Sequence, residues 1–157
     1  MAVATKSKAG PKAVDKPSAT PVDMAVLESK LGYQVRIADR VLSRDFFQNV
    51  GMTPVQFSVF SLVATNENLS QVAVGEALNM DRASTMAIVH KLELAGLLER
   101  RRSPHDRRMH ALQLTPKGRK EFVEVNKRVT EHDSRFSNRL TAAEMKTLLK
   151  CMKKLRG

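Results

Sequence analysis

Residues 97–118 read LLERRRSPHDRRMHALQLTPKG, and this stretch decides the fold. Two short runs, 97–102 and 109–114, flank a turn that contains a proline, and the second run alternates, so the stretch predicts a β-hairpin. Five arginines fall within the nine residues 100–108. Such a density of positive charge is self-repulsive unless a polyanion neutralises it. The hairpin therefore has the character of a DNA-binding wing.

The distribution of charge along the chain favours a nucleic-acid partner. The formal net charge is +11 at pH 7, yet residues 22–96 carry six basic and eight acidic groups, whereas residues 97–128 carry ten basic and four acidic groups. The positive excess falls on the hairpin, the N-terminal tail and the C-terminal region. A helix on a membrane surface needs a wide apolar face opposite its basic residues. We expect double-stranded DNA as the partner, and no membrane.

The composition is typical of a soluble intracellular protein. A chain of 157 residues is long enough for one domain with a core of its own. A single cysteine excludes an intramolecular disulfide framework and favours a reducing compartment. Residues 1–21 have little to bury and predict a disordered basic tail, which is either a solvated leader or an arm that contacts phosphates.

Two helices are predicted in residues 22–65. Asp23 is a good N-cap for one long amphipathic helix that runs to about residue 49. Thr53 and Gln56 then form a capping box for a second helix to about residue 65, with Pro54 at its first position.

The next two predicted helices are short and joined by a tight turn. Ser70 caps the first, which ends near residue 78, and Asp81 caps the second, which stops at Gly96. Two short helices joined in this way predict a helix-turn-helix, which the hairpin follows directly.

Two further helices are predicted after the hairpin. Thr115 and Pro116 open a helix over 116–136, and Thr141 begins a capping box for the last helix. The last helix carries an apolar stripe of Met145, Leu148, Leu149, Met152 and Leu155. The stripe packs on its own chain or on a second copy, and a dimer is favoured because these helices lie outside the helix-turn-helix unit.

The order of these elements and their local motifs resemble the MarR family of bacterial transcription regulators. LELAGLLERRRSPHDRRMHALQLTPKGR, residues 92–119, is similar to the family's run from the end of the recognition helix through the wing to the next helix. It contains Gly96 and Leu97, the element Asp106-x-Arg108, and Leu114-Thr115-x-x-Gly118. GMTPVQFSVF, residues 51–60, is similar to the opening of the family's second helix.

The resemblance covers about residues 24–156 and implies a mainly α fold with a small two- to three-stranded β-wing. It implies one domain over 22–157, with a winged helix-turn-helix at about 53–115 and dimerisation helices at about 23–49 and 116–156. In function it implies a homodimer in the bacterial cytoplasm, on the nucleoid when bound, that recognises pseudo-palindromic operators. A small anionic aromatic effector, such as an aromatic acid or its coenzyme A thioester, would release this repressor. A ligand-independent architectural DNA-binding protein is the alternative.

The helix over 81–95 supplies the predicted base contacts. Its inward stripe is predicted to be Ser84, Ile88, Leu92 and Ala95, and its DNA-facing residues are predicted to be Arg82, Ala83, Thr85, Met86 and His90, with Thr85 at the border. Recognition helices contact base edges with their N-terminal residues. Arg82 is the best candidate for a bidentate contact to guanine, and Ala83 or Met86 for a thymine methyl group. A plain surface charge is the alternative for Arg82, and a solvated imidazole for His90.

In the wing, Asp106 and Arg108 are spaced to brace the turn. Arg107 then points elsewhere and can enter a narrow A·T-rich minor groove, where the negative potential is enhanced. Arg102 is a further predicted DNA contact. A surface salt bridge that contributes little is the alternative interpretation of the wing residues.

The resemblance also places small ligands between the first helices and the winged domain. The residues predicted to contact an effector there are Tyr33, Arg36, Arg40, Phe57 and Phe60. Arg36 and Arg40 are like charges one helical turn apart, an arrangement that is unfavourable without an anion. An exposed polar face, or an ion pair across the dimer, is the alternative.

Other chemistry finds no support in the sequence. A nucleophile elbow, a phosphate loop and a Rossmann fingerprint are all missing, so we expect neither an enzyme nor a cofactor. The four histidines are scattered, which argues against a metal site. Cys151 lies beside the apolar stripe and is interpreted as a partly buried small hydrophobe rather than an oxidation sensor.

Overall fold

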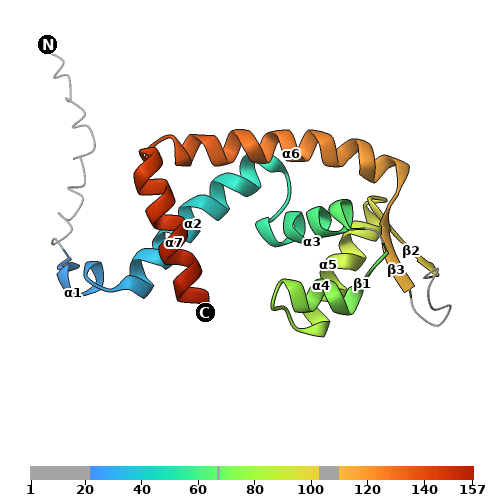
Figure 1. The fold of residues 1–157 in the computed structure, drawn as a ribbon, viewed down its shortest axis with the longest axis horizontal. Coiled ribbons are helices and arrows are strands. Elements are labelled where there is room, and N and C mark those ends of the chain that lie inside the picture. Colours follow the sequence, from blue (N-terminus) through green and yellow to red (C-terminus); the bar gives the residue numbers. More distant parts are fainter. Residues whose placement is uncertain (1–21, 67, 103–109) are drawn as a thin grey trace, which may run out of the picture. The chain divides into compact units, whose positions relative to one another are not determined.

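The computed structural model describes residues 22–66, 68–102 and 110–157 (Figure 1). The chain divides into two compact units, Met1–Val35 and Arg36–Gly157, and helix α2 runs across the boundary between them. The predicted basic tail and the predicted wing tip, with Asp106, Arg107 and Arg108, lie outside the described residues. No helix in the described part of the chain is both long and apolar enough to cross a membrane.

The first helical segment is broken, where the sequence predicts one continuous helix. Helix α1 covers Ala25–Glu28, and α2 covers Leu31–Val50. Between them the N–H of Lys30 bonds to a carbonyl only three residues back, at 2.9 Å. The side-chain amide of Gln34 donates to the carbonyl of Glu28 at 2.8 Å. These two bonds replace regular helical ones, so the chain turns before α2 begins.

Helices α3, α4 and α5 begin where their caps predict. They cover Pro54–Thr65, Gln71–Ala77 and Arg82–Leu94. The side chains of Thr53, Ser70 and Asp81 each accept a hydrogen bond from the backbone N–H three residues later, which satisfies one free donor of each helix. Helices α4 and α5 pack against each other as a helix-turn-helix (Figure 1).

A three-stranded antiparallel sheet lies beside these helices, with strand order β1-β3-β2. The strands are β1 (Leu69–Ser70), β2 (Leu98–Arg102) and β3 (His110–Leu114). Strands β2 and β3 are the predicted hairpin, and their register places Arg102 opposite His110. The spacing does not predict β1, because a two-residue strand has no periodicity and forms only through pairing of Leu69 with Leu112.

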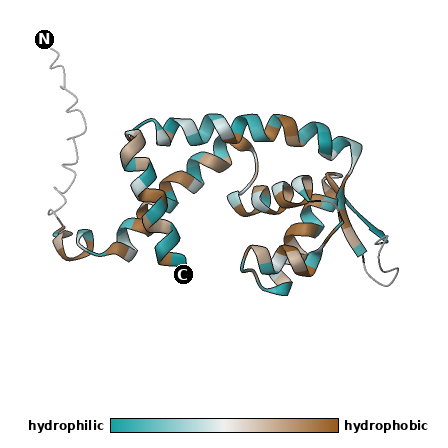
Figure 2. Cartoon of the chain, viewed as in Figure 1, coloured by the Kyte–Doolittle hydropathy of each residue, from teal (hydrophilic) through white to brown (hydrophobic). Residues whose placement is uncertain are grey.

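Two helices complete the chain, α6 over Pro116–Ser137 and α7 over Ala142–Arg156. Thr115 and Thr141 cap them as predicted. Figure 2 shows hydrophobic residues along part of α6, whereas hydrophobic and hydrophilic residues alternate on α7. No residue of α7 is buried. In a single chain Met145 of the apolar stripe is half-buried, whereas Leu148, Leu149, Met152 and Leu155 are exposed.

The hydrophobic core lies where α3, α5 and α6 meet the sheet. Phe60 of α3 and Val125 of α6 are fully buried, and Leu112 of β3 is nearly so. The ring of Phe60 packs edge-on against Phe122, with centroids 5.4 Å apart. Helix α5 and the sheet therefore pack against the same hydrophobic core.

Helices α2 and α6 are joined around a buried histidine. The ring of His132 lies between those of Phe46 and Phe136, with centroid distances of 5.0 and 5.1 Å. Its Nε2 is 3.5 Å from the carboxylate of Asp45, which also accepts a hydrogen bond from Arg135 at 2.8 Å. Aromatic packing and this polar cluster together fasten the two helices within the second unit.

Candidate nucleic-acid interface

Helix α5 is the candidate reading helix, and it is rotated slightly from the predicted orientation. Its buried residues are Thr85, Val89 and Leu92. Ser84, predicted to point inward, is exposed, and its hydroxyl donates to the carboxylate of the Asp81 cap at 2.6 Å. Thr85 takes the inward position and is only 1% exposed. The prediction that Thr85 faces DNA is therefore wrong.

The burial of Thr85 follows from the close approach of α4 and α5. A Cβ on Gly75 of α4 would lie 3.0 Å from Thr85 Oγ1 and 3.3 Å from the carbonyl oxygen of Met80. The Thr85 hydroxyl donates to the carbonyl of Asp81 at 2.8 Å, so its polar group is satisfied inside the core. Glycine at this position lets the two helices pack closely and sets the position of α5.

The outward face of α5 presents the other predicted base contacts to solvent. The exposed residues are Arg82, Ala83, Met86, Ala87 and His90. Met86 is 53% exposed, which places a large apolar side chain at the surface, where it suits contact with a thymine methyl group. The exposure satisfies what the prediction requires, and the base contacts themselves stay predictions.

The N-terminus of α5 carries a stable negative cap beside Arg82. Hydrogen bonds from the hydroxyl and the backbone N–H of Ser84 hold the pKa of Asp81 below its usual range. The positive end of the helix dipole also favours a carboxylate there. Asp81 therefore stays ionised near neutral pH, next to the arginine that is predicted to read a base.

The three arginines of β2 differ in their contacts. Arg100 Nε lies 3.1 Å from a carboxylate oxygen of Glu93, and Arg101 Nη2 lies 2.7 Å from one of Glu99. Arg102 is exposed at the hydrophilic end of the strand (Figure 2). Two of the three arginines thus have carboxylate partners within the chain. The alternative interpretation, a surface salt bridge, therefore applies to Arg100 and Arg101.

A hollow of about 670 Å³ lies between α4, the start of α5 and the sheet. Three basic side chains line it, namely Arg82, Arg100 and His110. Gln71 and Glu76 of α4 also line it, and Gln71 accepts a hydrogen bond from Arg100 at 3.2 Å. The hollow therefore connects the reading helix to the wing strands, and two arginines and one glutamate lie at its surface.

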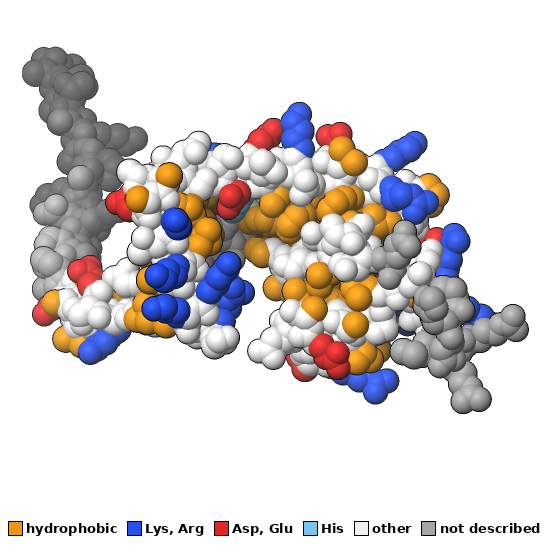
Figure 3. Space-filling view, in the orientation of Figure 1, with side chains coloured by type: hydrophobic (Ala, Val, Ile, Leu, Met, Phe, Trp, Pro, Cys, Tyr) orange, Lys and Arg blue, Asp and Glu red, His pale blue; other side chains and the backbone are white. Residues whose placement is uncertain are grey.

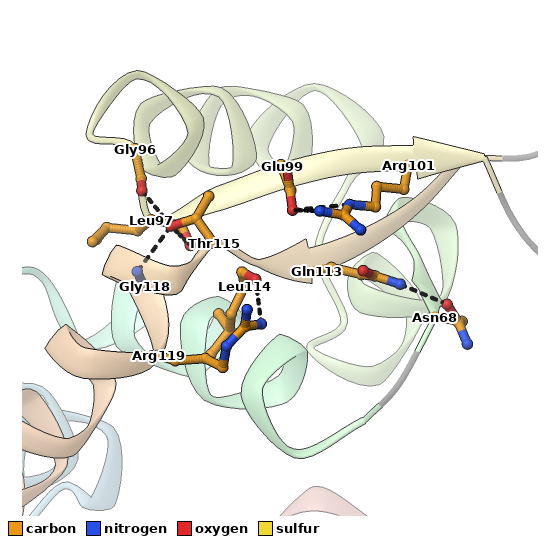
Figure 4. Close-up of polar contacts among 10 residues, drawn as sticks. All are labelled: Asn68, Gly96, Leu97, Glu99, Arg101, Gln113, Leu114, Thr115, Gly118 and Arg119. Carbon is orange, nitrogen blue, oxygen red and sulfur yellow. Dashed lines mark hydrogen bonds and ion pairs between the residues drawn. The ribbon is translucent and has the colours of Figure 1, made fainter.

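A compact polar junction fixes the base of the wing to α6 (Figure 4). The Thr115 hydroxyl donates to the carbonyl of Gly96 at 2.6 Å and accepts the N–H of Gly118 at 2.9 Å. Gly96 has a φ of +70°, which glycine adopts without strain and which ends α5. A Cβ on Gly118 would overlap the carbonyl oxygen of Leu97. The quoted motif Leu114-Thr115-x-x-Gly118 thus encodes a packing contact.

Neighbouring side chains strengthen this junction. Arg119 donates to the carbonyl of Leu114 at 2.8 Å, and Gln113 donates to Asn68 at 2.9 Å (Figure 4). Ala95, predicted to point inward, is exposed, and its carbonyl accepts a hydrogen bond from Lys117 at 2.8 Å. The end of α5, the sheet and the start of α6 are therefore linked through both backbone and side chains.

The predicted effector residues are divided between the two units. Tyr33 belongs to the first unit, and Arg36 and Arg40 are exposed on the part of α2 in the second unit. Phe57 of α3 is partly buried. Phe60 is fully enclosed in the core, so the prediction that it contacts an effector is wrong.

Residues suited to metal or redox chemistry do not form a site in the described part of the chain. No group of three His, Cys, Asp or Glu side chains is placed there to hold a metal ion. Cys151, predicted to be partly buried, is exposed on α7. The reason is that its helix has no covering element in a single chain.

Comparison with known proteins agrees with this geometry. The model of a family described as the MarR family matches residues 50–109. A curated relative from Thauera aromatica, named as a transcriptional regulatory protein for the hcr operon, is 34% identical over 133 residues, which cover 82% of this chain and 80% of the relative. The chain belongs to the MarR family. The mainly α fold with its small wing sheet confirms the predicted winged helix-turn-helix.

Two solved structures extend the similarity of this MarR-family chain to nearly its whole length. The transcriptional repressor CouR bound to a 23-mer DNA duplex is 33% identical, covers 88% of this chain and 100% of its own, and has a TM-score of 0.81. CouR bound to p-coumaroyl-CoA is 31% identical, covers 87% and 98%, and has a TM-score of 0.80. Because its relatives are regulators, this protein is a transcription regulator and not an enzyme.

Proposed function

We propose that this MarR-family regulator is a sequence-specific repressor that binds double-stranded DNA and is released by a small effector. The observation that carries the proposal is the outward face of α5, where Arg82, Met86 and His90 are exposed beside a hollow lined by basic side chains. The similarity to CouR, which has been solved bound to a DNA duplex, supports DNA binding by this chain.

In this proposal α5 enters the major groove and the wing contacts the adjacent minor groove. Arg82 reads a guanine, and Ala83 or Met86 contacts a thymine methyl group. Arg102 at the end of β2 approaches the DNA backbone or minor groove, together with Arg107.

The proposed functional unit is a homodimer. Leu148, Leu149, Met152 and Leu155 of α7 are all exposed in the single chain. A second copy would cover this apolar surface. In this proposal residues 22–157 form one domain, and its helices within 23–49 and 116–156 form the dimer interface. A two-fold axis would then present two reading helices to a pseudo-palindromic operator, with half-sites about one or two turns of about 10 bp apart.

The proposed effector is an aromatic acid or its coenzyme A thioester. The relative CouR has been solved with p-coumaroyl-CoA, which supports an aromatic thioester as the class. Arg36 and Arg40 on α2 are suited to the anionic part of such a ligand, and Phe57 of the same unit is suited to its ring.

DNA selection tests the repressor proposal. The full chain would be used to select binding duplexes from a random pool, and affinity would be measured for the selected duplex and a scrambled version across salt concentrations. We expect a selected pseudo-palindrome bound at least about a thousandfold more tightly than the scrambled duplex. Equal affinity for both duplexes would favour the alternative, a ligand-independent architectural protein.

Competition on the selected duplex tests the effector. We expect p-coumaroyl-CoA to release the DNA. Free coenzyme A and p-coumaric acid, tested separately, measure how much each part of the thioester contributes to the release. Because reciprocity links the two equilibria, DNA should weaken p-coumaroyl-CoA binding by the same factor. Binding of DNA that none of these compounds alters would remove this class of effector and leave the DNA-binding proposal standing.

A further inference from the structure

One arginine of β2 connects three elements of the winged domain. Arg100 Nε lies 3.1 Å from Glu93 Oε1 on α5, and Arg100 Nη2 lies 3.2 Å from Gln71 Oε1 at the first position of α4. We propose that Arg100 is a positioning residue that holds the wing strand against the reading helix and does not itself bind phosphate. The inference rests on the proposed DNA-binding function of this surface.

The geometry favours this role over direct phosphate binding. The guanidinium presents its donors in a rigid plane, and two of them already point at acceptors on different helices. The Glu93 side chain is only 22% exposed and the Arg100 side chain 39% exposed, so the pair lies partly within the protein. A lysine at this position would keep the charge but lose the planar fork that reaches both partners.

The neighbouring pair provides a matched comparison within the same strand. Arg101 contacts Glu99, two residues away on β2, through both Nε at 2.9 Å and Nη2 at 2.7 Å (Figure 4). Among the residues that the structure describes, that pair joins no second element, and the Arg101 side chain is 62% exposed. The two pairs therefore carry the same charges on adjacent arginines of one strand but differ in whether they connect β2 to the helices.

The position of β2 relative to α5 matters because both elements have to reach the same duplex. Contacts in a binding site need to be held within about 0.5 Å by supporting hydrogen bonds. Loss of the Arg100 contacts would let the wing strand move relative to α5, so that fewer contacts form together on the correct sequence. Loosely held non-specific binding would be affected less.

Removal of the two carboxylates separates positioning from plain electrostatics. Simple charge arguments predict that loss of an acidic side chain tightens DNA binding at both positions. We expect Glu93→Met instead to weaken binding to the selected duplex about tenfold, with the scrambled duplex changed less than about twofold, whereas Glu99→Met leaves both affinities unchanged or slightly tighter. Equal behaviour of Glu93→Met and Glu99→Met would overturn the proposal.

Substitution of the arginine itself gives a second, independent readout. We expect Arg100→Lys to weaken binding to the selected duplex as much as Glu93→Met does, although its charge is retained. We also expect Arg100→Met to keep the wild-type salt dependence. A phosphate ligand would behave oppositely: lysine would retain most of the affinity, and Arg100→Met would lower the slope by about 0.9. That pattern would overturn the proposal.

Hydrogen exchange of the free protein tests the positioning role without DNA. We expect the backbone amides of β2 and β3 to exchange faster in Glu93→Met and Arg100→Lys than in the wild type or Glu99→Met. Exchange identical in all four proteins would overturn the proposal. If the wild-type chain selected no duplex at all, the proposed function would fail, while this measurement would still decide whether Arg100 holds the wing.

Discussion

Gly118 lets α6 begin directly against the end of the reading helix. A Cβ there would overlap the carbonyl oxygen of Leu97. That carbonyl also accepts the N–H of Thr115 at 3.1 Å, so it cannot turn away without breaking a backbone hydrogen bond. A backbone oxygen cannot yield as the end of a flexible side chain would. The packing at this point therefore requires glycine.

We expect Gly118→Ala to lower the free energy of unfolding by about 1–3 kcal/mol, because the added methyl group overpacks a rigid contact. Urea unfolding of the full chain measures this change. Gly32→Ala is the control, since nothing lies within 4 Å of a Cβ at that helical position and alanine favours a helix. Equal losses in the two variants would contradict the contact between Gly118 and Leu97.

Asp81 makes the stability of α5 dependent on pH. Its folded pKa is lowered by the hydrogen bonds from Ser84, whereas the unfolded chain has the ordinary pKa of about 3.8. A lowered folded pKa adds stability that is fully present above the unfolded value and is lost as the pH falls through the folded value.

Asp81→Asn keeps an N-cap but cannot ionise. We therefore expect the wild type to melt at a higher temperature than Asp81→Asn near pH 7, with the difference shrinking below about pH 4. Thermal melts recorded from neutral to acidic pH measure this difference. A gap that stays constant over the whole range would show that the carboxylate charge contributes nothing.

At the scale of elements, the sequence predicts what depends on contacts a few residues apart. The capping box of Thr53 and Gln56 places the start of α3 correctly, because both partners lie within one turn. The rotation of α5 depends on Gly75 of another helix, and β1 depends on pairing across the chain with β3. The burial of Phe60, which makes it a core residue and not an effector contact, depends on packing against Phe122 of α6. Spacing alone carries no information about such distant partners.

The reading helix is the element on which sequence preference depends. We expect Arg82→Ala to weaken binding to the selected duplex by about 1–3 kcal/mol and to relax preference at one base pair, because a bidentate contact to guanine is lost. Affinities for the selected duplex and its single-base-pair variants measure both effects.

Lys91→Ala is the matched control, since it removes one positive charge from the same helix on the side opposite Arg82. It should lower affinity slightly and equally for every duplex. Identical base preferences in the wild type and Arg82→Ala would mean that Arg82 contributes only surface charge.

At the scale of the whole molecule, α7 presents more apolar surface than a single chain covers. Leu149 and Leu155 are 54% and 58% exposed, and Figure 3 shows hydrophobic side chains at the surface beside Lys and Arg side chains in the region of α7. Contiguous apolar surface of this kind marks an interaction site. The sequence predicts the stripe but not its partner. The spacing of apolar residues is the same whether the helix packs on its own chain or on a second copy.

A charge within the stripe should separate the proposed dimer. We expect Leu149→Glu to convert the protein to single chains at micromolar concentration and to weaken binding to the selected duplex, because one reading helix replaces two. Light scattering after gel filtration measures the mass. Lys150→Gln is the control, because it changes the net charge by the same amount as Leu149→Glu. Lys150 follows Leu149 in the sequence but lies outside the apolar stripe, so this variant should stay dimeric. A dimer that survived Leu149→Glu would show that other helices bury the interface.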